Sequence, residues 1–126
     1  MINDEPDARD LVAIALSSFR DSILPLVPAE QRFTALMIAN ALATAERELA
    51  AGDKAEPALA AAVGGLIGEE GALSVPLAVL VPRLCAAITD GRFDAAGPQA
   101  ALRRVLFDLT RARLAVSNPK LLAAGR

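Results

Sequence analysis

Apolar residues recur along this chain at the spacing of amphipathic helices, and no alternating run between hairpin turns indicates a strand. In the segment 7–23, one helical arc collects Leu11, Val12, Ala15, Leu16, Phe19 and Ile23. Pro25 ends this element, because the residue before a proline is pushed out of the helical conformation. Prolines and glycines divide the rest of the chain into four further helices, expected at 28–51, 53–67, 74–89 and 98–118.

The helix expected at 28–51 is apolar on two faces. One stripe contains Ile38, Leu42 and Leu49, and a second begins with Phe33, Leu36 and Met37. A helix that is apolar nearly all round is buried by neighbours on both sides. We therefore expect this helix at the centre of the bundle or in the core of an oligomer interface.

Pro82 lies inside the helix expected at 74–89, where a proline costs about 3 kcal/mol if the helix is regular. Either the helix kinks at Pro82 or it begins near Val81. Residues 1–6 and 122–126 are expected to fray. The connections are short, so consecutive helices should be antiparallel neighbours. The sequence thus predicts an all-α, up-and-down bundle of about five helices that forms a single domain, 1–126.

The composition excludes most familiar catalytic chemistry. The 126 residues include no His, Tyr or Trp and only one Cys, although these residue types carry much acid–base, nucleophilic and metal chemistry. Cys85 is expected to be a small buried apolar residue, because no His is present to activate its thiol. We therefore expect a protein that is not an enzyme and that holds no metal ion and no cofactor.

Hydrophobic residues make up 54% of the chain, against roughly 45–50% in typical soluble domains. This surplus favours a homodimer in which a second copy covers apolar surface, and the alternative is a compact Ala-rich monomer. No apolar stretch is long enough to span a membrane, and the N-terminus is acidic rather than basic. With a single Cys, these features favour a cytoplasmic protein that does not associate with membranes.

Charge is unevenly spread. From Gly97 onward the chain has six basic residues and one acid, a balance of +5, whereas the preceding part carries −7. The last long helix could pack on acidic neighbours, or it could form a site for an anion such as a phosphate or CoA. A low isoelectric point and only four aromatic residues argue against nucleic-acid binding.

Asn40 is an unusual residue for the middle of an apolar helix, because its amide competes for backbone hydrogen bonds. It could be buried and bonded to a neighbouring helix, contact a ligand, or lie on the surface. Thr44 and Arg47 share its helical face. Arg113 lies along the apolar seam of the last helix, where it would either pair with a carboxylate or extend its guanidinium into water. These four residues could surround one polar pocket.

Three segments resemble a known family in their order and spacing: FRDSILPL at 19–26, RFTALMIANALATAEREL at 32–49 and RLAVSNPKL at 113–121. The chain resembles a bacterial family of small helical proteins of unknown function. That family is often encoded beside aminoglycoside-phosphotransferase-like kinases and acyl-CoA dehydrogenases. Its recurring polar positions correspond here to Arg32, Asn40, Arg47, Glu48 and Asn118. Thr34 stands where relatives often have His, so the resemblance implies no His-dependent chemistry for this chain.

Two functional hypotheses follow. The first is a non-catalytic accessory protein that binds a partner and that, as the resemblance implies, assists a kinase–acyl-CoA dehydrogenase pair. The second is a helical bundle that binds a small acyl-CoA-like anion, with the basic last helix as anion site and the Ala- and Gly-rich helix at 53–67 leaving room for an acyl chain. The candidate binding residues for either hypothesis are Arg32, Asn40, Thr44, Arg47, Glu48, Arg113 and Asn118.

Overall fold

The computed structural model describes residues 5–69 and 75–125, and these residues form six α-helices and no strand. The all-α fold class predicted from the sequence is confirmed. The chain divides after Gly52 into two compact units, which are described one at a time. Whether they act as the single domain expected from the sequence stays a prediction.

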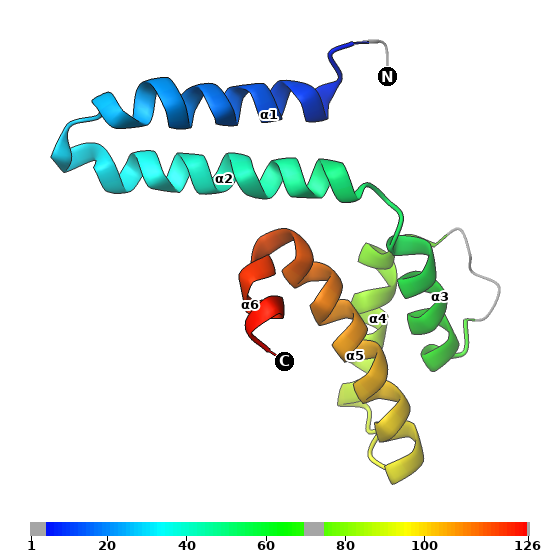
Figure 1. Cartoon of the computed structure of the whole chain (residues 1–126). Coiled ribbons are helices and arrows are strands. Elements are labelled where there is room, and N and C mark those ends of the chain that lie inside the picture. The colour runs from blue at the N-terminus through cyan, green and yellow to red at the C-terminus, as the bar shows by residue number, and fades with distance from the viewer. Residues whose placement is uncertain (1–4, 70–74, 126) are drawn as a thin grey trace. The chain divides into compact units, whose positions relative to one another are not determined.

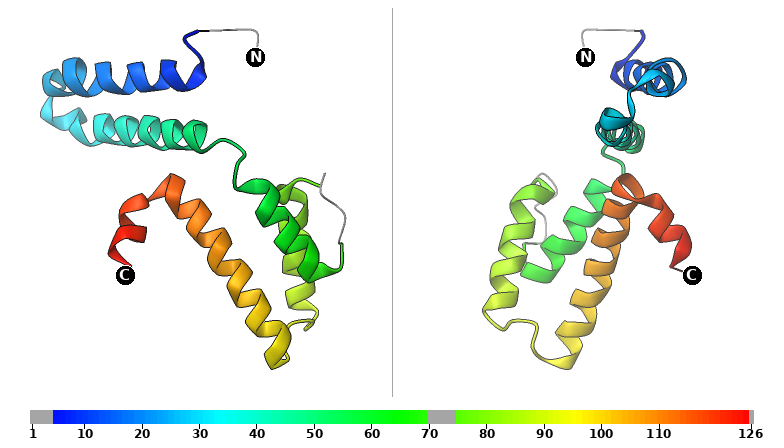
Figure 2. Two further views of the ribbon diagram at one scale, coloured as in Figure 1. Left: turned by 45° about the vertical axis from the view of Figure 1, so that its right-hand side comes forward. Right: turned by 90° about the vertical axis from the view of Figure 1, so that its left-hand side faces the viewer.

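The first unit is a helical hairpin. Helix α1, Ala8–Ser18, runs antiparallel to α2, Arg32–Ala51, and both views in Figure 2 show the two helices side by side. Asp7 caps α1, since its Oδ1 accepts a hydrogen bond from the backbone N–H of Asp10 at 2.9 Å.

The hairpin connection is helical in short pieces rather than in one continuous α-helix. The segment predicted to be helical to residue 23 changes at Phe19 into a π-helical turn, η1 (Phe19–Ile23), and then into a 3-10 turn, η2 (Leu24–Leu26). Pro25 has no backbone N–H and crowds the preceding turn, which explains the wider turn ahead of it. A second 3-10 turn, η3 (Ala29–Gln31), precedes α2, so α2 begins later than the predicted residue 28.

The hairpin core is made of small residues. Leu16 of α1 packs with Ala39 and Ala43 of α2, and Phe19 and Leu42 border this cluster. Because alanines face α1, the two helices meet through the smallest side chains of α2. Phe33, Leu36 and Met37 on the other side of α2 remain exposed. The structure therefore does not place this side of α2 at the centre of a helical bundle, and its place in the core of an oligomer interface stays a prediction.

The second unit contains the larger core. It consists of α3 (Glu56–Ile67), α4 (Leu77–Thr89), α5 (Ala96–Ser117) and α6 (Pro119–Ala124), with α6 folded back at the end of α5 (Figure 1). Val63, Leu80 and Leu84 are fully buried or nearly so. They pack with further buried residues of this unit, namely Ala60, Ala87, Phe93, Leu102, Val105 and Leu109.

Helix α4 resolves the two sequence alternatives for Pro82. The helix begins at Leu77 and runs through Pro82, so a start near Val81 is wrong. The predicted start at residue 74 lies outside the described residues. Asp90 and Gly91 end the helix as expected, with Gly91 at a φ of 81°, a conformation that glycine adopts without strain.

Helix α5 ends at Ser117, directly before Asn118 and Pro119, close to its predicted end. Helix α6, which starts at Pro119, has no counterpart among the helices expected from the sequence. Pro119 cannot continue α5, but proline is favoured in the first turn of a helix. The same residue therefore stops α5 and starts α6. The fraying expected for residues 122–126 remains a prediction.

Candidate interaction surface

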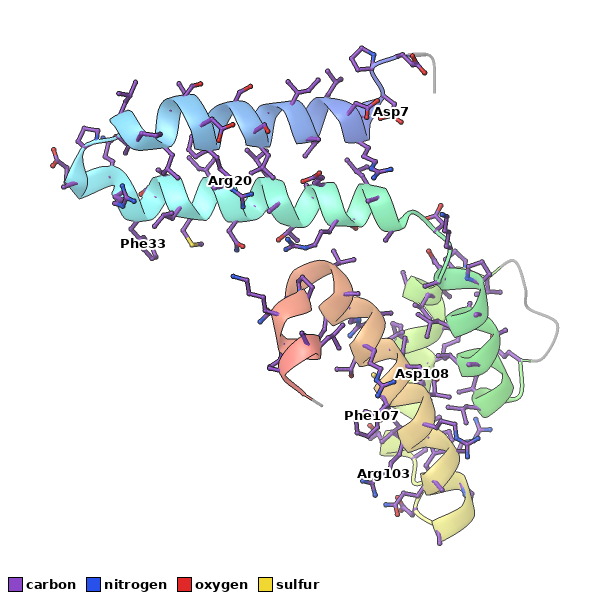
Figure 3. All side chains as sticks on the ribbon, in the orientation of Figure 1. Asp7, Arg20, Phe33, Arg103, Phe107 and Asp108 are labelled. Atoms are coloured by element: carbon purple, nitrogen blue, oxygen red, sulfur yellow. The ribbon has the colours of Figure 1, made fainter. Side chains whose placement is uncertain are left out.

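The turn end of the hairpin exposes large apolar side chains. Leu26 is 80% exposed and Phe33 is 76% exposed, and Figure 3 shows Phe33 pointing away from α1. We define the tip patch as Ile23, Leu26, Phe33, Leu36 and Met37, all of which are exposed. Exposed apolar surface often marks an interaction site where it is contiguous.

The position of the tip patch follows from the register of α2. Ala35, Ala39 and Ala43 recur every four residues and are buried, and Ala39 and Ala43 pack with Leu16 of α1. Phe33, Leu36 and Met37 lie three or four residues apart on a different side of the helix, so they form neighbours on its outer surface. The alanine stripe therefore decides which apolar residues of α2 remain exposed.

Asn40, Thr44 and Arg47 continue the face of the tip patch toward the end of α2. The hydroxyl of Thr44 donates to the backbone carbonyl of Asn40 at 3.0 Å, and the guanidinium of Arg47 donates to the Thr44 hydroxyl at 3.2 Å. Asn40 is exposed, whereas Thr44 and Arg47 are half-buried. The hypothesis that Asn40 is buried and hydrogen-bonded to a neighbouring helix is therefore wrong. The residue lies on the surface.

The other two candidate residues on α2 flank this face. Arg32 and Glu48 are exposed near opposite ends of the helix. The backbone carbonyl of Glu48 accepts the N–H of Gly52 at 3.1 Å, which closes the end of α2. Arg32 directly precedes Phe33, so it supplies a cation beside the tip patch.

Arg113 and Asn118 belong to the second unit. Arg113 is exposed, which matches the reading that its guanidinium reaches water. Asn118 is also exposed, and its side chain caps neither of the two helices that it joins. The structure thus groups Asn40, Thr44 and Arg47 on α2, and the single pocket shared with Arg113 stays a prediction.

Cys85 is exposed, so the expectation of a buried cysteine is wrong. The buried side of α4 carries Leu80, Leu84 and Ala87, and Cys85 is turned about 100° from Leu84 on the helix. Among residues 5–69 and 75–125, no three Cys, Asp or Glu side chains are grouped as a metal ion would require. No helix within these ranges is long and apolar enough to cross a bilayer.

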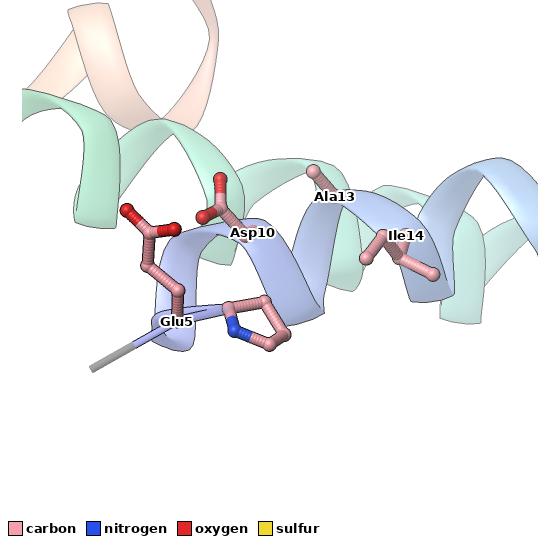
Figure 4. Close-up of a pocket in the computed structure, with 5 residues that line it drawn as sticks. Glu5, Asp10, Ala13 and Ile14 are labelled. Atoms are coloured by element: carbon pink, nitrogen blue, oxygen red, sulfur yellow. The ribbon is translucent and has the colours of Figure 1, made fainter. Parts of the chain in front are cut away.

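A shallow, open depression lies on the first unit, lined by Glu5, Pro6, Asp10, Ala13 and Ile14. Figure 4 shows the carboxyl groups of Glu5 and Asp10 near one another, with Ala13 and Ile14 further along α1. Its two carboxylates make this depression unsuitable for an anionic ligand.

Sequence reasoning missed this depression, because a depression depends on how the segment before α1 is placed. The sequence predicts a basic last helix, but the charge balance alone does not place its arginines around Phe107. Phe107 is 61% exposed, and Arg103, Arg104 and Arg111 on the same helix are exposed too. Their spacing of three or four residues from Phe107 is the signal that could have revealed the grouping.

The model of a family described as a domain of unknown function, DUF6285, matches residues 25–121 of the chain. The chain belongs to the DUF6285 family. The matched range contains most of the tip patch, namely Leu26, Phe33, Leu36 and Met37, together with all the binding residues considered above. No curated protein and no solved structure gives a significant match to the chain.

The DUF6285 match begins within the hairpin connection, so it includes α2 and nearly the whole second unit. It confirms the resemblance to a family of unknown function.

Proposed function

We propose that this protein is a non-catalytic interaction protein that binds a partner protein through the tip patch. The observation that carries the proposal is the distribution of apolar residues in the hairpin. Small alanines fill its core, whereas Leu26 and Phe33 are more than three-quarters exposed. A folded protein gains nothing from exposing such residues, whereas a partner that covers them gains about 1.5–3 kcal/mol for each.

The surroundings of the tip patch suit a protein interface. Binding surfaces commonly combine a few large apolar anchors with a polar rim that orients the partner. Arg32 and Asn40 supply such a rim on α2, and both are exposed. Thr44 and Arg47 are held by hydrogen bonds along the helix, so this part of the rim is ordered before binding.

The family resemblance suggests which partners to test. It implies an association with an aminoglycoside-phosphotransferase-like kinase and an acyl-CoA dehydrogenase. In this proposal the protein assists that pair without contributing a reacting group of its own. The absence of His from the sequence supports a binding role over an acid–base role.

Affinity isolation from a lysate of the native source tests the proposal. Tagged wild-type protein should recover a kinase or a dehydrogenase of these classes, and the double variant Leu26→Ser/Phe33→Ser should lose at least about 90% of it. Val79→Ser/Ile88→Ser is the matched control, because it removes two exposed apolar side chains from α4. Equal recovery by both variants would contradict a role for the tip patch.

The binding of an acyl-CoA-like anion is the second candidate. The exposed arginines of α5 support it, since phosphate groups could reach them. The space expected beside the glycines of α3 is partly filled, because the carbonyl oxygen of Glu69 lies against Gly64. Thermal unfolding with a panel of CoA esters tests this candidate, and an unchanged melting temperature with every ester would contradict it.

A further inference from the structure

The outer face of α5 combines one aromatic side chain with several cations. Phe107 is 61% exposed, with Arg103 and Arg111 one helical turn before and after it and Arg104 at its flank (Figure 3). No ion pair within the described ranges involves these arginines. Asp108, the one acid on α5, is turned about 100° from Phe107. The face therefore presents an apolar knob between positive charges.

The depression on the first unit has the opposite character. Pro6, Ala13 and Ile14 supply apolar surface, and Ile14 is 56% exposed. Glu5 and Asp10 supply two exposed carboxylates beside it, and neither forms an ion pair within the described ranges (Figure 4). The site is too open to enclose a small molecule, but its apolar surface beside two carboxylates suits an apolar side chain flanked by cations.

We propose that these two surfaces bind each other between copies of this chain. Phe107 of one copy packs against Ile14 of the partner subunit in the depression. Asp10 and Ile14 are one helical turn apart, about 6 Å along the axis, and so are Phe107 and each of Arg103 and Arg111. When the apolar side chains meet with the two helices aligned, a guanidinium is therefore placed near the carboxylate in either helix direction.

The complementarity of charge favours a second copy as the occupant. Each surface alone repels its own kind, because arginines would face arginines and carboxylates would face carboxylates. Each copy carries both surfaces, so the contact is between unlike patches, and it either closes into a small ring or extends further. The tip patch has no part in this contact, which makes self-association independent of the proposed partner binding.

Sedimentation of the full chain across a concentration series tests the proposal. Wild-type protein should associate as its concentration rises, and Phe107→Ser and Ile14→Ser should each weaken association by at least about tenfold. Circular dichroism should show native helix content for both variants, since both side chains are exposed. A wild-type protein that is monomeric at all concentrations would overturn the proposal, as would variants that associate like wild type.

Mixing the two variants provides the sharper test. Phe107→Ser retains the depression and Ile14→Ser retains the aromatic knob, so an equimolar mixture should form a one-to-one complex through the remaining intact contact. A mixture that stays monomeric would contradict the pairing of Phe107 with Ile14. Leu26→Ser/Phe33→Ser should associate like wild type, so a failure of this inference is distinguishable from a failure of partner binding.

Charge reversal tests the ionic part of the contact. Arg103→Glu/Arg111→Glu should lose self-association because acids then face Glu5 and Asp10. Adding Glu5→Arg/Asp10→Arg to the same chain should restore it at low salt. Failure of the combined variant to associate while the two reversed pairs fold normally would exclude this pairing of charges.

Discussion

The carbonyl oxygen of Glu69 lies 3.2 Å from the position that a Cβ atom on Gly64 would occupy. The two residues are also joined by a hydrogen bond of 2.8 Å, in which the backbone N–H of Glu69 donates to the carbonyl of Gly64. Gly68, at a φ of 77°, turns the chain back over the end of α3 and produces this contact. A side chain at Gly64 would therefore crowd this carbonyl, whereas its neighbour Gly65 is exposed with no atom near its own Cβ position.

The first prediction uses these adjacent glycines. Gly64→Ala should lower the free energy of unfolding by about 1 kcal/mol, because the contact with Glu69 outweighs the gain in helix propensity. Gly65→Ala should raise it by about 1 kcal/mol, since the new methyl group meets open space within a helix. Urea denaturation measures both changes, and shifts of the same sign would contradict the described end of α3.

The second prediction concerns the side chain of the same Glu69. Its carboxylate accepts from Nη1 of Arg83 at 2.6 Å and 2.8 Å, which ties the end of α3 to α4. Both groups are partly exposed, so Glu69→Gln should cost only about 0.5 kcal/mol at low ionic strength and less in 1 M salt. Arg92→Gln is the control, because Arg92 forms no described ion pair. Equal effects of the two substitutions would argue against the pair.

The third prediction tests the hairpin core. Leu16→Ala should destabilise the protein by about 2–3 kcal/mol, because Leu16 is the one large side chain buried in that core. Leu11→Ala should change the stability by less than about 0.5 kcal/mol, since Leu11 is half-exposed on the same helix. Thermal unfolding followed by circular dichroism distinguishes the two variants, and a similar loss in both would place the core elsewhere.

The fourth prediction concerns Pro82. Its ring nitrogen cannot donate to the carbonyl of Ala78, so α4 lacks one hydrogen bond within its length. Pro82→Ala should therefore stabilise the protein by about 1–2 kcal/mol after the greater freedom of the unfolded chain is allowed for. Pro76→Ala should bring no gain, because Pro76 lies outside the helix at its N-cap position. A destabilised Pro82→Ala variant would contradict a continuous α4.

The helical class and most helix ends could be predicted from the sequence because they depend on local signals. Gly52 and Gly91 follow helix ends with a positive φ, which glycine adopts without strain. Asn118 ends α5 because the residue before a proline is pushed out of the helical conformation. The sequence predicts starts at residues 28 and 53, whereas α2 begins at Arg32 and α3 begins at Glu56. Proline permits a first turn without specifying whether that turn is α or 3-10.

The tip patch could not be located from the sequence alone. Periodicity identified the two apolar stripes of α2, but burial depends on which side the neighbouring helix covers. Ala35, Ala39 and Ala43 form the buried side of α2, and Ala39 and Ala43 pack with Leu16 of α1, so Phe33 and its neighbours lie on another, exposed side. The burial of Asn40 is one expectation from the sequence, because apolar residues share its helical face. That face is exposed, and Asn40 is exposed with it.

Site-specific photo-crosslinking in the native cell tests the proposed function most directly. A photoreactive side chain in place of Phe33 should give a discrete covalent adduct with a kinase or dehydrogenase partner, and the same group in place of Val79 on α4 should not. Leu26→Ser in the same chain should weaken the adduct. Equal labelling from positions 33 and 79, or no adduct from position 33 while the protein is folded and expressed, would contradict partner binding at the tip patch.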